Sequence, residues 1–205
     1  MVVSPVIGGV IAFGIMAALY AIFARSKPGK VSFVFHNLQR LSAAAVSFSH
    51  GQNDAQKTMG VITLALVAFH LLPNSKNVHI PTWVIVSCAT AMGLGTAIGG
   101  WRIIRTLGTR IIRLEPINGF AAEASASLVI FGASVLGYPV STTHVVSGSI
   151  FGVGIAKRAS GVRWAVAQRM VATWVITLPA AAAVSGLLLA VIRLGGGHAV
   201  ALLAR

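Results

Sequence analysis

The chain has 205 residues, of which 56% are hydrophobic and only 9% are charged, whereas a soluble domain typically carries about 25% charged residues. Three runs, 2–24, 82–101 and 170–192, lack charge altogether, and each approaches the roughly 20 residues that cross a bilayer as a helix. This composition excludes an ordinary soluble domain. It predicts an all-α, polytopic helical membrane protein in which residues 1–205 form a single transmembrane domain.

The net charge of +13 raises the question of a nucleic-acid partner. However, most of the lysines and arginines fall into clusters that flank the apolar runs, as cytoplasmic loops of membrane proteins do. We therefore expect no nucleic-acid partner, and a multi-pass protein of the cell (inner) membrane whose basic loops are cytoplasmic. The clusters are Arg25, Lys27, Lys30 and Arg40; Arg102, Arg105, Arg110 and Arg113; and Lys157, Arg158, Arg163 and Arg169.

Residues 2–23 predict the first span, and because they lack the basic start and the cleavage site of a signal peptide, we expect them to be retained. The next segment, 41–72, is too long for one simple crossing. At 1.5 Å per residue it would extend about 48 Å, against roughly 30 Å of hydrocarbon. The polar sequence SHGQND interrupts it. We therefore predict a broken helix over 41–72, with half-helices at about 41–50 and 55–72 that meet at an unwound SHGQND.

Residues 82–100 predict a span that returns to the basic side, and WRIIRTLGTRIIRL follows it. The four arginines of that sequence lie within about 140° of helical arc, with isoleucine and leucine over most of the remainder. This pattern is typical of a helix that lies in the membrane interface. Cys88, the lone cysteine, lies in the apolar run and is expected to pack rather than to react.

After Pro116 the chain runs apolar to Gly137, GYPVSTTH breaks the helix, and residues 142–156 lead to the third basic cluster. Because both ends then lie on the basic side, residues 118–156 predict a helical hairpin, either spanning or re-entrant. Residues 170–192 predict the last span. Under this topology all three basic clusters lie on one face of the membrane.

Asp54 is one of only three acidic residues in the chain. A carboxylate at the centre of a membrane helix costs about 2.5–3.5 kcal/mol, so such a residue is a functional candidate. The alternative is that Asp54 caps the second half-helix by accepting from the amides of Gln56 or Lys57. Capping alone does not explain why Asn53, His50 and Lys57 gather around it.

The sequence PVSTTH, residues 139–144, forms a second candidate site. Gly137 can end the preceding helix in a left-handed conformation, and Ser141 is a natural N-cap for the next one. That helix would begin with free amides, the positive end of its dipole and the hydroxyls of Ser141, Thr142 and Thr143. Together these groups suit an anion such as phosphate. The alternative is a plain cap within a hairpin turn.

Three further interpretations concern Glu123 and the histidines. Glu123 lies among small residues that permit close helix contacts; it could bind a cation or carry a proton, or it could be a first-turn glutamate favoured by the helix dipole.

A metal site from His50, Asp54 and His144 lacks regular ligand spacing, so no metal is predicted. Ser141, His144 and Asp54 do not predict a hydrolase, because no G-x-S-x-G elbow is present. We expect that the protein is not an enzyme.

Two of these sequences together resemble the PiT family of inorganic phosphate transporters. HGQNDAQKTMG carries a G-x-N-D-A signature after an S-x-S-H lead, and GYPVSTTHVVSGSIFGVG carries the P-x-S-T-T-H turn. The resemblance covers most of residues 40–156, and the Q-K-T-M-G ending is similar to bacterial members. It implies secondary active transport of inorganic phosphate, coupled to protons or sodium. It also implies a fold of two inverted repeats with the site at the membrane midplane.

The resemblance also implies roles for the candidate residues. The substrate would be bound by Ser141, Thr142, Thr143, Asn53 and Asp54. The coupling ion would be bound by Asp54, Glu123 and Asn53. Support would come from His50, Gln52 and His144. No bound cofactor is expected, only a co-transported proton or sodium, and the phosphate could travel as a complex with a divalent metal.

A whole member of this family carries each signature twice, whereas SHGQND and PVSTTH each occur once in this chain. The chain therefore resembles the C-terminal half of such a transporter, which a missing N-terminal half or a second subunit would complete. Two alternatives stay open. One is a sulfate transporter of the same fold, and the other is an inactive truncated half-transporter.

Overall fold

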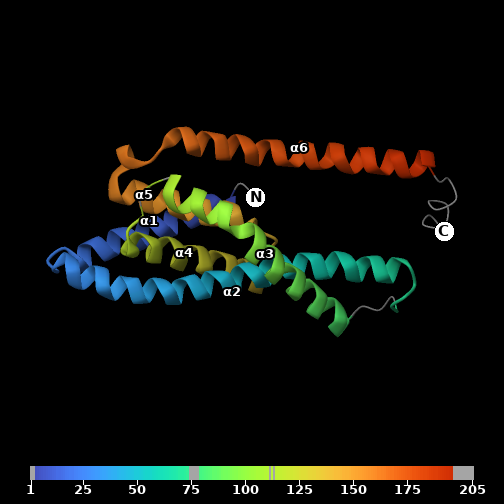
Figure 1. The fold of residues 1–205 in the computed structure, drawn as a ribbon, viewed down its shortest axis with the longest axis horizontal. Helices are drawn as coiled ribbons and strands as arrows, with labels where there is room; N and C mark the ends of the chain where they lie inside the picture. The colour runs from blue at the N-terminus through green and yellow to red at the C-terminus, as the bar shows by residue number, and fades with distance from the viewer. Residues whose placement is uncertain (1–2, 74–78, 111, 113, 196–205) are drawn as a thin grey trace.

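The computed structural model describes residues 3–73, 79–110, 112 and 114–195, and of 101–110 and 194–195 only the backbone (Figure 1). This part of the chain is all-α, as predicted. The helices are α1 (Val3–Phe23), α2 (Pro28–Ala68), α3 (Thr82–Arg110), α4 (Pro116–Val135), α5 (Thr142–Arg158), a short 3-10 helix η1 (Ala159–Gly161) and α6 (Trp164–Gly195).

Within the described residues, three helices are long and apolar enough to cross a membrane, and they coincide with the predicted spans. They are α1, the Thr82–Gly100 part of α3 and the Trp164–Arg193 part of α6, with mean hydropathies of 2.4, 1.5 and 2.3. The sequence predicted an interfacial helix that follows the span. In the structure its first part, residues 101–110, is a continuation of the span, because α3 runs without a break to Arg110. The side chains of 101–111 and 113 lie outside the described residues.

The predicted break within 41–72 is wrong. Helix α2 runs uninterrupted for 41 residues from Pro28 to Ala68, and Gly51 has an ordinary helical backbone with open space where a Cβ would lie. Three polar side chains of SHGQND, those of Ser49, Asn53 and Asp54, bond sideways to α4 and α5, so they do not need an unwound backbone. The extra length lies partly at the start of α2, where Pro28 in the first turn begins the helix well before residue 41.

The predicted hairpin is confirmed as α4 and α5, joined by residues 136–141. Gly137 has a φ of +74°. The amide of Tyr138 donates to the Ala133 carbonyl at 2.9 Å, and that of Gly137 to the Ser134 carbonyl at 3.2 Å. This pair of bonds is a Schellman motif, which requires a left-handed residue and therefore favours glycine.

Helix α1 packs along α5 through glycines that let the two backbones touch. A Cβ added at Gly148 would lie 2.1 Å from the Pro5 carbonyl oxygen, and one added at Gly152 would lie 2.0 Å from that of Gly9. Beside this contact lies the main core of the described chain, around Met16, Phe35 and Val153 and their neighbours. Helix α2 packs against α4 and completes the bundle.

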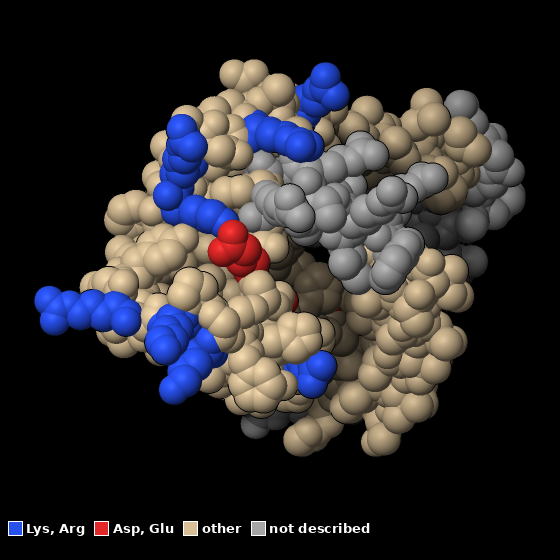
Figure 2. All heavy atoms as spheres, turned by 60° about the vertical axis from the view of Figure 1, so that its left-hand side comes forward, with Lys and Arg blue, Asp and Glu red and all other residues tan. Residues whose placement is uncertain are grey.

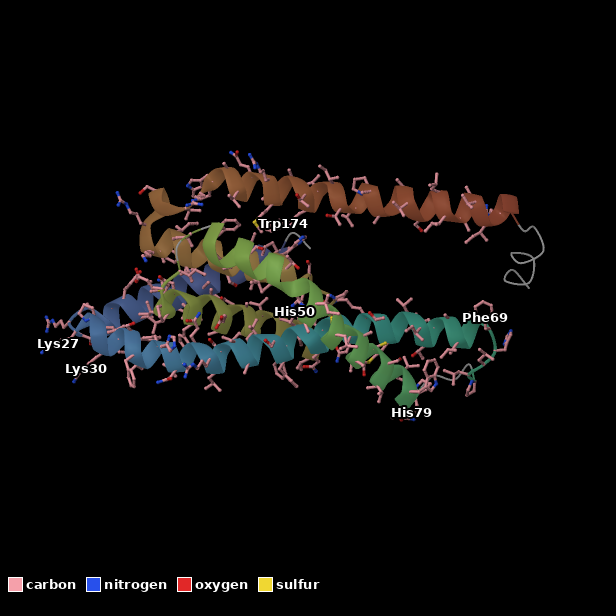
Figure 3. All side chains as sticks on the ribbon, viewed as in Figure 1. Lys27, Lys30, His50, Phe69, His79 and Trp174 are labelled. Carbon is pink, nitrogen blue, oxygen red and sulfur yellow. The ribbon has the colours of Figure 1, made fainter. Side chains whose placement is uncertain are left out.

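Most of the basic side chains that the structure describes gather at one end of the bundle, Lys57 and Arg193 being the exceptions. The α1–α2 connection with Lys27 and Lys30 lies at the same end as the α5–α6 connection (Figures 1 and 3). Viewed toward this end, Figure 2 shows lysines and arginines spread over the surface. Lys157 pairs there with Glu115 at 2.8 Å. Helix α6 runs along one side of the bundle (Figure 1). Its first turns pack against the core through Val166 and Met170, whereas an 18-residue hydrophobic stretch of it buries no residue against the described chain.

Candidate functional site

The side chains of Asp54 and Thr142 join the two predicted sites. The Thr142 hydroxyl donates to Asp54 Oδ2 at 3.1 Å, across 88 residues of sequence. Thr142 is the first residue of α5 and is only 3% exposed. The bond fixes the N-D signature of α2 against the beginning of α5, where the S-T-T sequence lies.

Two cationic or potentially cationic side chains of α2 also surround the Asp54 carboxylate. Lys57 Nζ lies 3.0 Å from Oδ1, and His50 Nε2 lies 3.4 Å from Oδ2. These contacts exclude the predicted role of Asp54 as a helix cap, because α2 does not begin at this point and the carboxylate bonds to side chains. The Asp54 side chain keeps 27% exposure, so a ligand can still reach it.

Asn53 and Gln52 place buried carbonyl oxygens beside this carboxylate in the sequence. Asn53 is 3% exposed, and its Nδ2 donates to Ser134 Oγ of α4 at 2.8 Å. Asn53 Oδ1 and Gln52 Oε1 have no hydrogen-bond partner within the described part of the chain. Buried polar atoms are normally satisfied, so these two oxygens are suited to a cation or a donor group that binds from outside.

The beginning of α5 is where the sequence predicts an anion site, and the hydroxyl of Thr142 there already donates to Asp54. Ser141 occupies the N-cap position with an extended backbone, but its side chain makes no capping hydrogen bond. Its hydroxyl is therefore not used by the helix. Thr143 is exposed. His144 stacks on Trp174 of α6, with ring centroids 4.3 Å apart, which supports the packing interpretation of this histidine.

Glu123 is not brought to Asp54. Its Oε2 accepts from Ser42 Oγ of α2 at 2.5 Å. Ser42 precedes Asp54 by twelve positions, a separation of about 18 Å along the helix at 1.5 Å per residue. Glu123 is not a first-turn residue either, because α4 begins at Pro116 and has no acidic residue in its first turn. The dipole interpretation of Glu123 is therefore wrong, and its predicted role toward the coupling ion stays a prediction for a carboxylate that lies apart from Asp54.

Serines that the sequence interpretation missed continue the contact between α2 and α4. Ser49 and Ser127 are hydrogen-bonded at 3.1 Å, between the Glu123–Ser42 and Asn53–Ser134 contacts. The sequence did contain a signal for this contact. Ser42 and Ser49 are seven residues apart, as are Ser127 and Ser134, and this spacing places each pair on one face of its helix. The two helices therefore share a polar seam, defined as these three side-chain contacts.

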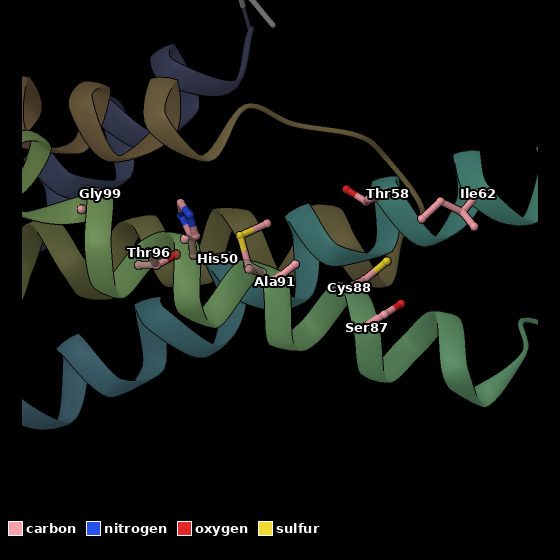
Figure 4. Close-up of a pocket in the computed structure, with 11 residues that line it drawn as sticks. His50, Thr58, Ile62, Ser87, Cys88, Ala91, Thr96 and Gly99 are labelled. Atoms are coloured by element: carbon pink, nitrogen blue, oxygen red, sulfur yellow. The ribbon is translucent and has the colours of Figure 1, made fainter.

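A cavity of about 800 Å³ lies between α2 and α3 and adjoins the site. Figure 4 shows His50, Thr58 and Ile62 of α2 on one side and residues of α3, including Cys88, on the other. Because His50 both lines this cavity and contacts Asp54, the cavity reaches the neighbourhood of the carboxylate. No group of three histidine, cysteine, aspartate or glutamate side chains in the described ranges could hold a metal ion.

Comparison with known proteins agrees with this geometry. Residues 1–185 match the profile described as the phosphate transporter family. The chain belongs to this family. The match includes both the α2 signature and the α4–α5 hairpin.

Members of the phosphate transporter family similar to this chain include proteins named "probable low-affinity inorganic phosphate transporter". That of Bacillus subtilis (strain 168) is 48% identical over 89% of this chain and 54% of its own length. That of Rhizobium meliloti (strain 1021) is 46% identical over 91% of this chain and 55% of its own. The chain thus spans about half the length of these relatives.

A solved structure, "The sodium-dependent phosphate transporter", shares the fold. It superimposes with a TM-score of 0.78 and 26% sequence identity, over 94% of this chain and 65% of that one. The arrangement of α1 to α6 is therefore that of a phosphate transporter fold, in agreement with the predicted fold class.

Proposed function

We propose that this chain is one half of a secondary transporter of inorganic phosphate, in which the beginning of α5 binds the anion and Asp54 carries the coupling cation. The observation that carries the proposal is the hydrogen bond from Thr142 to Asp54. This bond supports a single site in which the N-terminus of α5 would bind the anion beside a membrane carboxylate. The names of the similar proteins support phosphate as the substrate.

At the beginning of α5, the anion would meet unpaired backbone amides, the positive end of the helix dipole and the hydroxyls of Ser141, Thr142 and Thr143. The N-cap position of Ser141, with its side chain making no capping bond, leaves that hydroxyl available to an oxyanion. Asn53 would complete the site from α2, with Gln52, His50 and His144 supporting it.

Although Lys57 already lies 3.0 Å from it, the Asp54 carboxylate would repel an arriving phosphate, and a bound coupling cation would reduce this repulsion, which gives a physical basis for coupling. An anion that enters a negative-inside cell also needs positive charge to accompany it, because each elementary charge costs about 2.3 kcal/mol per 100 mV. A proton and sodium are both candidates, and the similar solved structure is named as sodium-dependent. Glu123 enters the proposal as a separate carboxylate of the polar seam, held by Ser42.

The complete transporter would consist of this chain and a second half, present either in a longer chain or as a second subunit, related to it as an inverted repeat. Because the basic residues lie at one end of the bundle, we propose that this end is cytoplasmic and that the membrane is the cell (inner) membrane. The protein would carry phosphate without chemical change and would not be an enzyme.

Thr142→Val is expected to raise the KM for phosphate in the complete transporter by about tenfold, since a hydrogen bond to a charged group contributes about 1.5–3 kcal/mol. The measurement is uptake of labelled phosphate into proteoliposomes. Thr63→Val is the matched control, because Thr63 is equally buried but donates only to the Met59 carbonyl of its own helix.

Unchanged phosphate uptake by Thr142→Val would contradict the proposed site. Competition by sulfate in the same vesicles tests the substrate class, and we expect excess sulfate to leave phosphate uptake intact. Uptake equally well inhibited by sulfate would favour the sulfate alternative. Residues 1–205 reconstituted without a second half are expected to be inactive.

A further inference from the structure

The ammonium of Lys57 lies between two oxygens that belong to different parts of the fold. Its Nζ is 3.0 Å from Asp54 Oδ1, one turn earlier on α2. It also donates to the backbone carbonyl of Val140 at 2.5 Å. The Lys57 side chain is 39% exposed, so it is not enclosed in a core.

The Val140 carbonyl belongs to the turn between α4 and α5 and lies outside both helices. Carboxylates and the carbonyls of non-helical backbone are the groups that bind sodium ions in transporter sites. The ammonium of Lys57 therefore occupies a position between two oxygens that would otherwise suit a metal cation.

We propose that Lys57 is the built-in cation of this site and that it excludes sodium from Asp54. A second positive charge within a few ångströms of the ammonium is disfavoured, and the oxygens that would coordinate sodium are already bound. The proposal rests on the proposed function and adds a specificity-determining residue to it.

Two histidines are the other ionisable side chains of the SHGQND and PVSTTH sequences. His50 of α2 faces Oδ2 of the same carboxylate, and His144 of α5 packs on Trp174 of α6. The alternative is that Lys57 only anchors the 136–141 turn to α2, which would affect stability but not cation preference.

The experiment compares the complete wild-type transporter with Lys57→Gln, which keeps a hydrogen-bonding side chain without the charge. Two quantities are measured in proteoliposomes: binding of labelled sodium, and phosphate uptake when sodium replaces choline. Wild type is expected to bind no sodium at this site, and its uptake should not respond to the replacement. Lys57→Gln is expected to bind sodium, and sodium should then raise its uptake by at least about fivefold, the lower end of typical coupling between two bound species.

Two variants serve as controls. Lys57→Arg keeps the charge and should behave as wild type toward sodium. Lys157→Gln removes a lysine of another lysine–carboxylate pair, with Glu115, and should also leave the sodium response unchanged.

Sodium binding by wild type at Asp54, or a folded Lys57→Gln that still binds none, would overturn the proposal. If Lys57→Gln fails to fold, the proposal is judged from sodium binding by wild type and by Lys57→Arg. Neither should bind sodium at Asp54, and binding by either would overturn the proposal. A wild-type protein that takes up no phosphate under any cation would refute the proposed function, whereas the sodium-binding measurement would still judge the role of Lys57.

Discussion

Asp54→Asn should abolish coupled phosphate uptake by the complete transporter while leaving the protein inserted in the membrane. Two donors, Thr142 and Lys57, bind the two carboxylate oxygens of Asp54, and His50 Nε2 lies 3.4 Å from Oδ2. Asparagine offers one acceptor oxygen and an NH2 group that can only donate. One of the donors would therefore face another donor, and the ammonium of Lys57 would lose its counter-ion.

We expect uptake by this variant to fall at least about tenfold, which corresponds to about 1.4 kcal/mol of lost stabilisation. The measurement is the initial rate of phosphate uptake into proteoliposomes driven by an imposed ion gradient, with the inserted amount determined in the same vesicles. Insertion should persist, because the neutral asparagine is less costly in a membrane than a carboxylate.

Glu115→Gln provides the matched control for Asp54→Asn. Glu115 is also an acid paired with a lysine, Lys157, but it lies at the basic end of the bundle and its side chain is 63% exposed. This variant should transport as wild type does. Normal uptake by Asp54→Asn would refute the role of the carboxylate, whatever the control shows.

The spans and the hairpin turn were predictable because their signals are local. An apolar run of about 20 residues can satisfy its backbone in lipid only as a helix, which predicted α1, α6 and the first part of α3. The left-handed Gly137 followed from the needs of a helix C-terminus. In each case the decisive physical requirement lies within a few residues of the sequence position concerned.

The continuity of α2 was not predictable in the same way. A polar cluster in a membrane helix can be satisfied by unwinding or by partners on neighbouring helices, and the sequence does not show which. Asn53 finds Ser134, and Asp54 finds Thr142, each more than 80 residues away. The same limit explains Glu123, whose partner Ser42 lies 81 residues away. In each case a contact with a distant part of the chain determined the structure, and the neighbouring sequence gave no indication of that contact.

The candidate site contains one contact that the sequence indicated and one that it did not. The residue types of the N-D and S-T-T sequences, together with their resemblance to a family, predicted that Asp54 and Thr142 would work together, and they are in contact. The contact of Lys57 with the Val140 carbonyl had no equivalent signal, because a backbone carbonyl in a turn can accept from any donor that the fold brings near it.

Gly152→Ala is expected to destabilise the folded protein by more than the 1–3 kcal/mol that is typical of an overpacked core. The added methyl would lie 2.0 Å from the Gly9 carbonyl oxygen. That atom belongs to the backbone of α1, so no side-chain rotation can relieve the clash. The two helices would have to separate along the contact that also holds Gly148 against Pro5. The measurement is thermal unfolding of purified protein in detergent.

Two other glycines separate this clash from the general effect of replacing glycine in a helix. Gly14 of α1 and Gly132 of α4 have nothing within 4 Å of an added Cβ. Alanine at either position should be neutral or should stabilise the protein by about 0.5–1 kcal/mol, because it reduces the entropy lost on folding. Equal stability of Gly152→Ala and Gly132→Ala would show that α1 and α5 do not approach as closely as the structure places them. A loss confined to Gly152→Ala would identify the α1–α5 contact as the surface on which the binding hairpin is held.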